Sequence, residues 1–463
     1  MTLIKSISGI RGTIGGKPGE GLSPPDVVKF TSAFATFIKN NTDAKKIKFI
    51  VGRDARVSGE MVNHLVVGTL LGMGVDVIDG GLSTTPTIEM AVIDAEADGG
   101  IILTASHNPE KWNALKLLNG KGEFISAKDG AELLAIAEKE EFEYAGVNNL
   151  GIYRKDDSFI DKHIRKIIDL SLVDVDVIKK AGFRVAIDCV NSTGGIAIPK
   201  LLKALGVNKI DELYCEPTGK FPHNPEPLPE NLGEISETVK KNNADVGFVV
   251  DPDVDRLAII TDEGEMFGEE YTLVTVADYI LQNKKGNTVS NLSSTRALRD
   301  ITEKYGGAYS ASSVGEVNVV EKMKETYAVI GGEGNGGVIY PELHYGRDAL
   351  VGIALFLTYL AKSGKKCSAL RATYPKYFIS KNKIELSSEI DVDGILSGII
   401  EKYKNHKTNK TDGVKIEFDK EWVHLRKSNT EPIVRIYSES DSETKAEHLA
   451  NKLIEDIKEI IRA

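Results

Sequence analysis

The sequence is poor in cysteine and lacks long apolar runs. Its three cysteines, Cys189, Cys215 and Cys367, are widely spaced and form no Cys-x-x-Cys pair, and an odd count argues against a disulfide framework. No apolar stretch reaches the roughly 18 residues of a membrane-spanning helix, and the first residues lack the apolar core of a signal peptide. We therefore expect a protein of the reducing cytoplasm that does not bind membranes.

Several signatures of enzyme classes are also missing. The sequence has no Gly-Lys-Ser/Thr P-loop, no Gly-x-Ser-x-Gly elbow and no grouped histidines, which argues against a P-loop, an acyl-transfer triad and a zinc cluster. The formal net charge of −10 argues against a nucleic-acid partner, since such proteins usually show a basic face. A small anionic ligand stays compatible with this charge, because a local cluster can reverse its sign within a cleft.

Strand and helix patterns alternate over the 463 residues, a length that suggests about three or four domains. Such alternation indicates βαβ units with mixed, mostly parallel sheets, and therefore an α/β fold. One rhythm recurs at 47–56, 183–195 and 287–297, where a β-rich run is broken by a polar loop and followed by a helical pattern. The predicted boundaries are 1–152, 153–260 and 261–372 for three related α/β domains and 373–463 for a smaller α+β domain.

Local patterns predict individual elements. Ser23 before a Pro-Pro pair is typical of a helix start, and strands are predicted at 47–51 and 75–78 with a helix between them. In the last domain, three β-rich runs predict adjacent antiparallel strands. Ser440-x-x-Glu443 predicts a capping box at the start of the final helix.

Ser106 follows an abrupt change from apolar to polar sequence. The apolar run 101–103 is typical of a buried strand, and the Asn-Pro that follows Ser106 and His107 is typical of a turn, which predicts an exposed serine at the strand end. A hydroxyl is a poor nucleophile unless a base or a metal assists it. His107 is the one histidine with an evident role, and Lys116 lies ten residues after Ser106. The alternative is a turn serine that caps the next helix.

Asp251, Asp253 and Asp255 stand two residues apart after an apolar strand, in GFVVDPDVDR. In an extended segment this spacing directs the three carboxylates to one side, where their repulsion favours a divalent cation. Oxygen-only ligands favour Mg²⁺, and Arg256 stands where an EF-hand requires glycine. Arg256 could pair with one of the acids or contact a phosphate. The alternative is a solvated acidic turn.

Glu333 and Asn335 are the only side chains within the glycine loop GGEGNGG, residues 331–337. An acid and an amide on uncluttered backbone suit hydrogen bonds to sugar hydroxyls. The loop lacks the spacing of a dinucleotide fingerprint. An ordinary glycine turn is the alternative.

The segment LRKSNTEPIV, 425–434, crowds polar side chains into a predicted loop between strands. These side chains are Arg426, Ser428, Asn429 and Thr430. A guanidinium fork, hydroxyls, an amide and exposed backbone N–H groups suit a bound phosphate, and an ordinary hairpin is the alternative. Arginines among glycines at 8–13 and 52–59 indicate phosphate contacts or salt bridges.

Together these segments supply a hydroxyl that could carry a phosphoryl group, a hard-cation site, a hydroxyl-binding loop and an anion site, which fits phosphoryl transfer on a phosphorylated sugar. With this set the sequence resembles the α-D-phosphohexomutases, the phosphoglucomutase/phosphomannomutase superfamily. TASHNP resembles its phosphoserine loop, DPDVDR its Mg²⁺ loop, GGEGNGG its sugar-specificity loop and RKSNTEP its phosphate-binding loop, in the family's order. The resemblance implies three α/β domains and a smaller fourth domain around a central cleft.

The resemblance also implies roles. Ser106 would be stored as phosphoserine and would exchange its phosphoryl group with a hexose 1- or 6-phosphate through a hexose 1,6-bisphosphate. Lys116 would be the general base, with its pKa lowered by crowding with Arg11 and the metal. The implied catalytic residues are Ser106, His107, Lys116 and Arg11. The implied ligands of one Mg²⁺ per chain are Ser106, Asp251, Asp253 and Asp255. The implied substrate-binding residues are Arg256, Glu333, Asn335, Arg426, Ser428, Asn429 and Thr430.

Two departures from the family pattern bear on mechanism and substrate. Gly337 stands where many members have a histidine, so the acid/base group that some relatives use there is missing. Ala114 replaces a glycine of the phosphoserine loop. Both variants resemble a branch of archaeal-type phosphoglucosamine mutases and bifunctional phosphomannomutase/phosphoglucomutases, and SSVGEVNV at 312–319 resembles a loop of the former. We therefore expect conversion of glucosamine 6-phosphate to glucosamine 1-phosphate, with the bifunctional activity as the alternative, in a monomer or homodimer.

Two other interpretations use the same residues. FVVDPDVD superficially matches a haloacid-dehalogenase-type phosphatase or mutase, in which Asp251 would be the nucleophile and Ser106 idle. A non-catalytic sugar-phosphate sensor on the same fold would bind its ligand without turnover.

Overall fold

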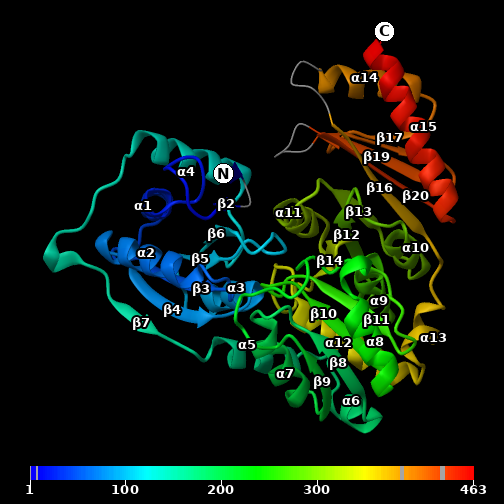
Figure 1. The fold of residues 1–463 in the computed structure, drawn as a ribbon, viewed down its shortest axis with the longest axis horizontal. Coiled ribbons are helices and arrows are strands. Elements are labelled where there is room, and N and C mark those ends of the chain that lie inside the picture. Colours follow the sequence, from blue (N-terminus) through cyan, green and yellow to red (C-terminus); the bar gives the residue numbers. More distant parts are fainter. Residues whose placement is uncertain (1, 7–8, 386–390, 428–432, 463) are drawn as a thin grey trace. The chain divides into compact units, whose positions relative to one another are not determined.

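The computed structural model describes residues 2–6, 9–385, 391–427 and 433–462 (Figure 1). The chain forms two compact units. Unit 1 comprises Met1–Asn283 and Asn335–Arg371, and unit 2 comprises Lys284–Gly334 and Ala372–Ala463.

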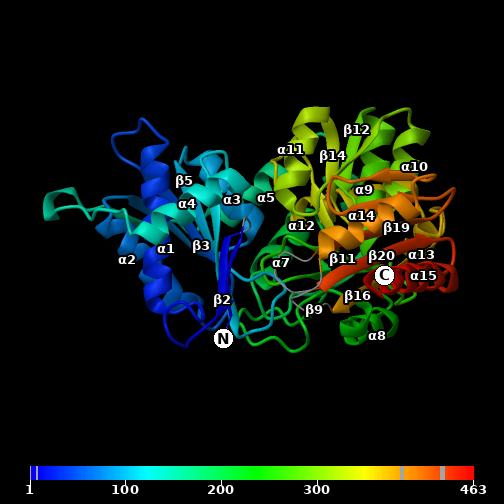
Figure 2. The same ribbon diagram turned by 90° about the horizontal axis from the view of Figure 1, so that it is seen from above.

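The N-terminal sheet of unit 1 has the strand order β1-β2-β6-β5-β3-β4-β7. Its strands are β1 (Leu3–Ser6), β2 (Gly9–Thr13), β3 (Lys48–Arg53), β4 (Asp76–Leu82), β5 (Gly99–Leu103), β6 (Trp112–Asn119) and β7 (Tyr153–Lys155). Its helices are α1 (Pro24–Asn40), α2 (Gly59–Gly72), α3 (Thr85–Asp94) and α4 (Ala127–Lys139), and a 3-10 turn η1 (Val147–Asn149) precedes β7. Strands β3, β4, β5 and β7 run parallel, whereas β1, β2 and β6 add antiparallel pairs. Helices α1, α2 and α4 bury their apolar sides on one face, and α3 covers the other (Figure 2).

A second sheet of unit 1 has the order β11-β10-β8-β9, with β11 antiparallel to three parallel strands. Its strands are β8 (Arg184–Asp188), β9 (Lys209–Leu213), β10 (Val246–Val250) and β11 (Leu257–Thr261). The other elements of unit 1 are α5 (Phe159–Ile168), α6 (Val175–Ala181), α7 (Gly194–Ala204), η2 (Pro229–Asn231), α8 (Gly233–Asn242), α9 (Glu269–Asn283), β15 (Gly337–Ile339), α12 (Ala349–Ser363) and α13 (Cys367–Arg371). The apolar α12 is buried along most of its length, where Phe356 packs edge-on against Phe248 and Phe267.

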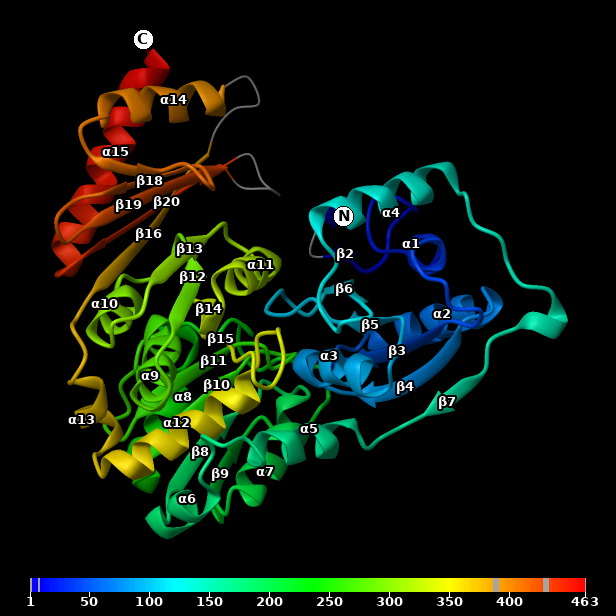
Figure 3. The ribbon, with the colours of Figure 1, turned by 180° about the vertical axis from the view of Figure 1, so that it is seen from behind.

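Unit 2 contains parallel strands β13, β12 and β14 as neighbours in that order, and a five-stranded antiparallel sheet of order β16-β20-β19-β18-β17. The first group comprises β12 (Asn287–Asn291), α10 (Ala297–Lys304), β13 (Tyr309–Ser312), α11 (Glu316–Thr326) and β14 (Ala328–Glu333). The second comprises β16 (Phe378–Glu385), α14 (Val392–Lys402), β17 (Lys407–Asn409), β18 (Val414–Glu417), β19 (Trp422–Lys427), β20 (Ile433–Ser440) and α15 (Glu443–Arg462). Helices α14 and α15 pack their apolar residues on one face of this antiparallel sheet (Figure 3).

The predicted rhythm of strand, polar loop and helix is confirmed. Its three copies contain β3, β8 and β12, each in the interior of its own sheet and each followed by a helix. The three predicted antiparallel strands of the last domain are β18, β19 and β20. The α/β expectation with a smaller α+β C-terminal part is therefore confirmed, whereas the central cleft stays a prediction.

The predicted capping box of the last helix is wrong by two residues. Ser442 precedes α15, and its Oγ accepts a hydrogen bond of 3.3 Å from the Lys445 N–H, which is the N-cap pattern. The Ser440 hydroxyl instead donates to Glu421 across the sheet. The Ser-x-x-Glu spacing alone could not distinguish these two serines.

Cys189, Cys215 and Cys367 are free thiols in the structure. Among the residues that the structure describes, no helix has both the length and the apolar character needed to cross a membrane.

Polar loops follow the carboxyl ends of the central parallel strands. In unit 1, one pair of such loops follows β3 and β5, and another pair follows β8 and β10. Because parallel strands end at the same edge of a sheet, the loops of each pair become neighbours, which is where ligands usually bind in open α/β sheets.

Candidate active site

Ser106 lies in the loop after β5 and is buried rather than exposed as predicted, with 9% of its surface accessible. Its φ of +48° is in the left-handed region, an uncommon conformation for a residue other than glycine and one that often marks a functional site. Its N–H donates to Thr104 Oγ1 at 2.9 Å, and its Oγ donates to Asp251 Oδ2 at 2.7 Å. The loop therefore turns the hydroxyl toward a carboxylate 145 residues away in the sequence.

Arg56, in the loop after β3, holds the Ser106 loop in place. The guanidinium is almost fully buried and donates to four carbonyl oxygens. These belong to Ser106 (2.5 Å), Asn108 (2.7 Å), Pro109 (2.9 Å) and Trp112 (2.9 Å). Its Nε donates to Asp54 Oδ2 at 3.0 Å, and that carboxylate also accepts from Thr104. Of the two predicted roles for the 52–59 arginines, Arg56 has the structural one, a salt bridge.

Replacement of Arg56 by lysine should destabilise unit 1 by about 3 kcal/mol, because one ammonium cannot serve four carbonyls and a buried carboxylate together. Arg53→Lys is the matched control, since Arg53 makes one backbone hydrogen bond and is half-buried. The measurement is urea unfolding of the whole chain. Equal losses for the two variants would contradict the role of Arg56.

The three aspartates after β10 converge, although not as predicted from an extended segment. Residues 251–256 form a turn in which buried Val254 has a φ of +64°, a strained value for a β-branched residue. Oxygen atoms of Asp251, Asp253 and Asp255 lie within 4.8 Å of one another, and all three side chains are fully buried. The turn, and not strand alternation, brings the carboxylates together.

Several hydrogen bonds fix the turn. Asp251 Oδ1 accepts from the N–H groups of Asp255 (3.2 Å) and Arg256 (3.1 Å). The Thr85 side chain at the start of α3 donates to Asp253 Oδ2 at 2.5 Å, and its N–H donates to the Asp253 carbonyl at 2.9 Å. The loop after β8 adds the hydroxyls of Ser192 and Thr193, which both donate to the Pro252 carbonyl.

Lys116, on β6, lies against two of the three carboxylates. Its Nζ is 2.7 Å from Asp253 Oδ2 and 3.3 Å from Asp255 Oδ2. Burial lowers the pKa of Lys116, but the charges of Asp253 and Asp255 outweigh burial and raise this pKa above its usual range. The predicted lowering of the Lys116 pKa involves a bound metal ion and stays a prediction.

Burial and neighbouring charges shift the pKa values of Asp251 and Asp253 in opposite directions. Burial, followed by repulsion from Asp255 and Asp253, raises the pKa of Asp251 well above its usual range. Burial acts in the same direction on Asp253, but the Lys116 ammonium outweighs it and lowers the pKa of Asp253. The Ser106 hydroxyl thus donates to a carboxylate whose pKa is raised.

The carboxylate group fits a divalent cation. Asp253 Oδ1 and Asp255 Oδ1 are buried, and neither accepts a hydrogen bond from the residues that the structure describes. Buried carboxylate oxygens without donors are costly unless a cation compensates them. An oxygen-only donor set with a serine hydroxyl beside it suits Mg²⁺.

Three further predicted residues lie within unit 1. His107 Nδ1 lies 3.4 Å from Ser106 Oγ, and burial and then the charge of Arg256 hold the pKa of His107 well below its usual range. The Arg256 guanidinium donates to Glu226 Oε1 at 3.1 Å. Arg11 on β2 is half-buried and pairs in register with Ala114, two residues from Lys116.

The remaining predicted residues divide between the units. In unit 2, Glu333 ends β14, and its Oε1 accepts from Asn291 Nδ2 (2.9 Å) and the Gly315 N–H (3.0 Å). Arg426 on β19 donates to Asp412 Oδ2 at 3.2 Å. Asn335 begins the second segment of unit 1, where its Oδ1 is buried and accepts no hydrogen bond from a described residue. The predicted positions that lie outside the described residues are Ser428, Asn429 and Thr430.

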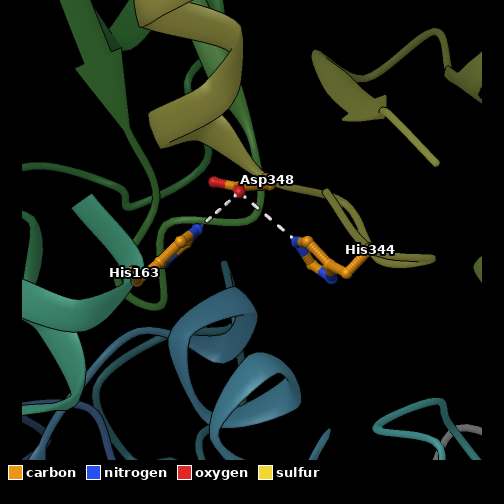
Figure 4. A group of neighbouring side chains, drawn as sticks. All are labelled: His163, His344 and Asp348. Atoms are coloured by element: carbon orange, nitrogen blue, oxygen red, sulfur yellow. Dashed lines mark hydrogen bonds and ion pairs between the residues drawn. The ribbon is translucent and has the colours of Figure 1, made fainter. Parts of the chain in front are cut away.

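A second buried group comprises His163 on α5, His344 in the loop before α12, and Asp348, the residue before α12 (Figure 4). Asp348 Oδ2 lies 2.9 Å from His163 Nε2 and 3.3 Å from His344 Nε2, and Oδ1 accepts from the N–H groups of Leu350 and Val351. Hydrogen bonds to the two rings and to the helix end account for this group. We interpret it as an anchor that fixes the start of α12.

Sequence patterns missed three residues that shape the site, namely Arg56, Thr85 and Arg347. Arg347 Nη2 lies 2.7 Å from Asp255 Oδ2, on the carboxylate oxygen that also faces Lys116. The arginine among glycines at 52–59 gave a signal for Arg56. Thr85 and Arg347 gave none, because each reaches the aspartates only through the fold.

Comparison with known proteins gives matches along nearly the whole chain. Family profiles for phosphoglucomutase/phosphomannomutase alpha/beta/alpha domains I, II and III and for the C-terminal domain match residues 3–144, 161–264, 268–377 and 390–456. A phosphoglucomutase/phosphomannomutase of Thermococcus kodakarensis is 38% identical, with 96% of this chain and 98% of the relative covered. A phosphoglucosamine/phosphogalactosamine mutase of Sulfurisphaera tokodaii is 33% identical, with 98% of each covered. The crystal structure of a phosphoglucomutase/phosphomannomutase family protein from Burkholderia thailandensis superposes with a TM-score of 0.85 at 26% identity, covering 99% of this chain and 97% of that one.

Proposed function

Because the chain belongs to the phosphoglucomutase/phosphomannomutase family, we propose that it interconverts hexose 1-phosphates and hexose 6-phosphates with Ser106 as the phosphoryl carrier. Membership makes the chain a phosphohexomutase, which is an isomerase. The assignment of Ser106 is our proposal. It has its main support in one observation, the 2.7 Å hydrogen bond between Ser106 Oγ and Asp251 Oδ2 within the group of three buried aspartates.

The same geometry supports a Mg²⁺ ion held by Asp251, Asp253, Asp255 and an oxygen on Ser106. When bound, Mg²⁺ would offset negative charge on a transferring phosphoryl group. The protein's own groups bind and orient the reactants. The Ser106 hydroxyl donates a hydrogen bond to Asp251, and Lys116 lies against Asp253 and Asp255, where its ammonium can hold a phosphate oxygen or exchange a proton once the carboxylate charge is compensated.

A mutase of this type needs the same pocket to accept a sugar phosphate in two orientations. We propose that Glu333 and Asn335 bind sugar hydroxyls and that Arg426, with Ser428, Asn429 and Thr430, binds the phosphate that is not transferred. The carboxylate of Glu333 and the Asn335 amide suit hydroxyl donors, and a guanidinium suits a phosphate. The intermediate would be a hexose 1,6-bisphosphate.

Glucosamine phosphate is our first candidate substrate. Its support is the 33% identity over nearly the full length to a relative named for phosphoglucosamine and phosphogalactosamine. Glucose and mannose phosphates are the second candidate, favoured by the 38% identity to a relative named phosphoglucomutase/phosphomannomutase. Sugars that differ by an epimeric centre or a 2-amino group differ by one or two hydrogen bonds in a pocket, so family membership does not rank them.

A direct assay ranks the two candidates. The 1-phosphates of glucosamine, N-acetylglucosamine, glucose and mannose are compared at equal concentration with Mg²⁺ and a trace of the matching bisphosphate, and kcat/KM is measured for each. We expect glucosamine phosphate to exceed glucose and mannose phosphates by at least about tenfold, the discrimination that one or two hydrogen bonds provide. A higher kcat/KM for glucose or mannose phosphate would transfer the assignment to the bifunctional activity, and no turnover of any sugar would refute the proposed function.

A further inference from the structure

Gly337 has no side chain, yet the space beside its Cα is filled. A Cβ atom added at Gly337 would lie 2.4 Å from Arg347 Cδ and 3.0 Å from Arg347 Cγ. Real Cβ atoms essentially never make a non-bonded contact as short as 2.4 Å. The Gly337 backbone does not have the left-handed φ that would itself call for glycine. With Arg347 on its present path, only glycine fits at this position, and the group that takes the space is the stem of Arg347.

The local fold brings these two residues together. Ile339 and Arg347 pair as an antiparallel bridge, and the Asp348 N–H donates to the Val338 carbonyl at 2.8 Å. The segment from Gly337 to Arg347 thus leaves β15 and returns alongside it, which sets residue 347 against residue 337. Both positions belong to the same segment of unit 1.

The group of His163, His344 and Asp348 holds the end of this returning segment (Figure 4). Asp348 follows Arg347 directly, and its carboxylate is bound by both imidazoles and by the first N–H groups of α12. The Ala349 N–H also donates to the Val254 carbonyl at 3.2 Å, in the turn that carries the aspartates. The backbone of Arg347 is therefore fixed relative to Asp255.

We propose that Arg347 is a positioning residue of the phosphoryl-transfer site, which fixes Asp255 and supplies a permanent positive charge beside it, while its aliphatic stem occupies the space that Gly337 leaves open. Arg347 is 9% exposed, and its Nη2 lies 2.7 Å from Asp255 Oδ2. This ion pair occupies Oδ2 and leaves the buried Oδ1 of Asp255 available to a cation. The catalytic meaning of this inference rests on the proposed function.

The consequence concerns the missing histidine. A side chain at 337 and the present path of Arg347 exclude each other, so in this chain an arginine stem, and not an imidazole, occupies the space beside residue 337. Arginine cannot exchange protons in a protein at ordinary pH. This corner of the site therefore provides charge and orientation, whereas proton transfer in both half-reactions falls to other groups.

A double-mutant cycle tests whether a side chain at residue 337 and the present path of Arg347 exclude each other. Gly337→Ala, Arg347→Ala and the double variant are unfolded thermally in EDTA, without sugar. Gly337→Ala should lower the midpoint by about 2–4 °C, because it displaces the arginine from Asp255, and should cause no further loss in the Arg347→Ala background. If the two single variants lowered the unfolding midpoint additively, or if Gly337→Ala alone left it unchanged, a side chain at 337 would not exclude the present path of Arg347. This readout needs no catalytic activity, so it stands even if the proposed function fails.

Measurements of turnover test the proposed positioning role of Arg347. Gly337→Ala and Arg347→Ala should each lower kcat by about a hundredfold with less than about a threefold change in KM, and the double variant should fall no further. Arg347→Lys should recover part of the loss, whereas Arg347→Met, which keeps the volume but not the charge, should not. Equal activities of the lysine and methionine variants would overturn the requirement for charge. Wild-type kcat in all variants, alongside an active parent enzyme, would overturn the positioning role while leaving the proposed function in place.

Discussion

Replacement of Ser106 by alanine should abolish mutase turnover, with a fall in kcat of about 10⁵-fold or more, the scale seen when a covalent nucleophile is removed. The methyl group cannot accept a phosphoryl group, and no other hydroxyl is hydrogen-bonded to Asp251 among the described residues. Binding of the hexose phosphate should change less than about tenfold, since the residues proposed to bind sugar and phosphate are retained. The measurements are a coupled assay and calorimetric binding.

Two further variants complete this experiment. Because Ser106 has a left-handed φ, Ser106→Gly removes the hydroxyl while relieving backbone strain, and it should be as inactive as the alanine variant. Ser126→Ala, which removes the N-cap of α4, is the control and should keep full turnover. Parent-level interconversion by Ser106→Ala would end the assignment of Ser106. Phosphopeptide mapping should find an acid-stable phosphate on Ser106.

Replacement of Asp253 by asparagine should weaken the affinity for Mg²⁺. The loss should exceed the roughly 10–100-fold that removal of an outer partner of a metal ligand costs. The change removes one of three carboxylate charges but keeps an oxygen that can accept the 2.5 Å hydrogen bond from Thr85, so the turn should survive. The expected result is a higher Mg²⁺ concentration for half-maximal rate. Binding of Mn²⁺, followed by electron paramagnetic resonance without substrate, gives the same comparison independently of activity.

Asp262→Asn is the matched control for this second experiment. It removes one negative charge from the same unit, and the Ser368 N–H can still donate to the remaining oxygen. Its metal titration should match that of the parent protein. An unchanged titration for Asp253→Asn would remove Asp253 from the proposed ligands, whereas a shift as large in the Asp262 variant would show a general effect of charge.

Family membership and geometry also decide between the rival interpretations. A haloacid-dehalogenase-type enzyme is excluded, because the four profiles of the phosphohexomutase family match along the chain. In addition, both oxygens of Asp251 already accept hydrogen bonds, from two backbone N–H groups and from Ser106. A sensor without turnover would have no use for a hydroxyl in this position, and the Ser106 experiments distinguish it from an enzyme.

The family, the fold class and the identities of the central residues could be predicted from the sequence. The apolar run before Ser106 is the buried β5, and the apolar run before Asp251 is the buried β10. Short polar motifs after buried strands can be recognised in the sequence, because strand periodicity and turn residues act locally. Errors arose where one local pattern allowed two neighbouring solutions, as with Ser440 and Ser442, or where exposure was inferred from a turn, as with Ser106.

Long-range contacts were beyond local patterns. The sequence by itself determined which chemical groups are available: a serine hydroxyl, three carboxylates at a spacing of two, a lysine and a glycine loop. Only the tertiary structure decided which of these groups meet. Lys116 pairs with Asp253 and Asp255, and Arg347 takes the space at Gly337. The physical reason is that hydrophobic periodicity and turn propensity act over a few residues. The pairing of buried charges instead depends on loops from two different sheets, which only the fold brings together.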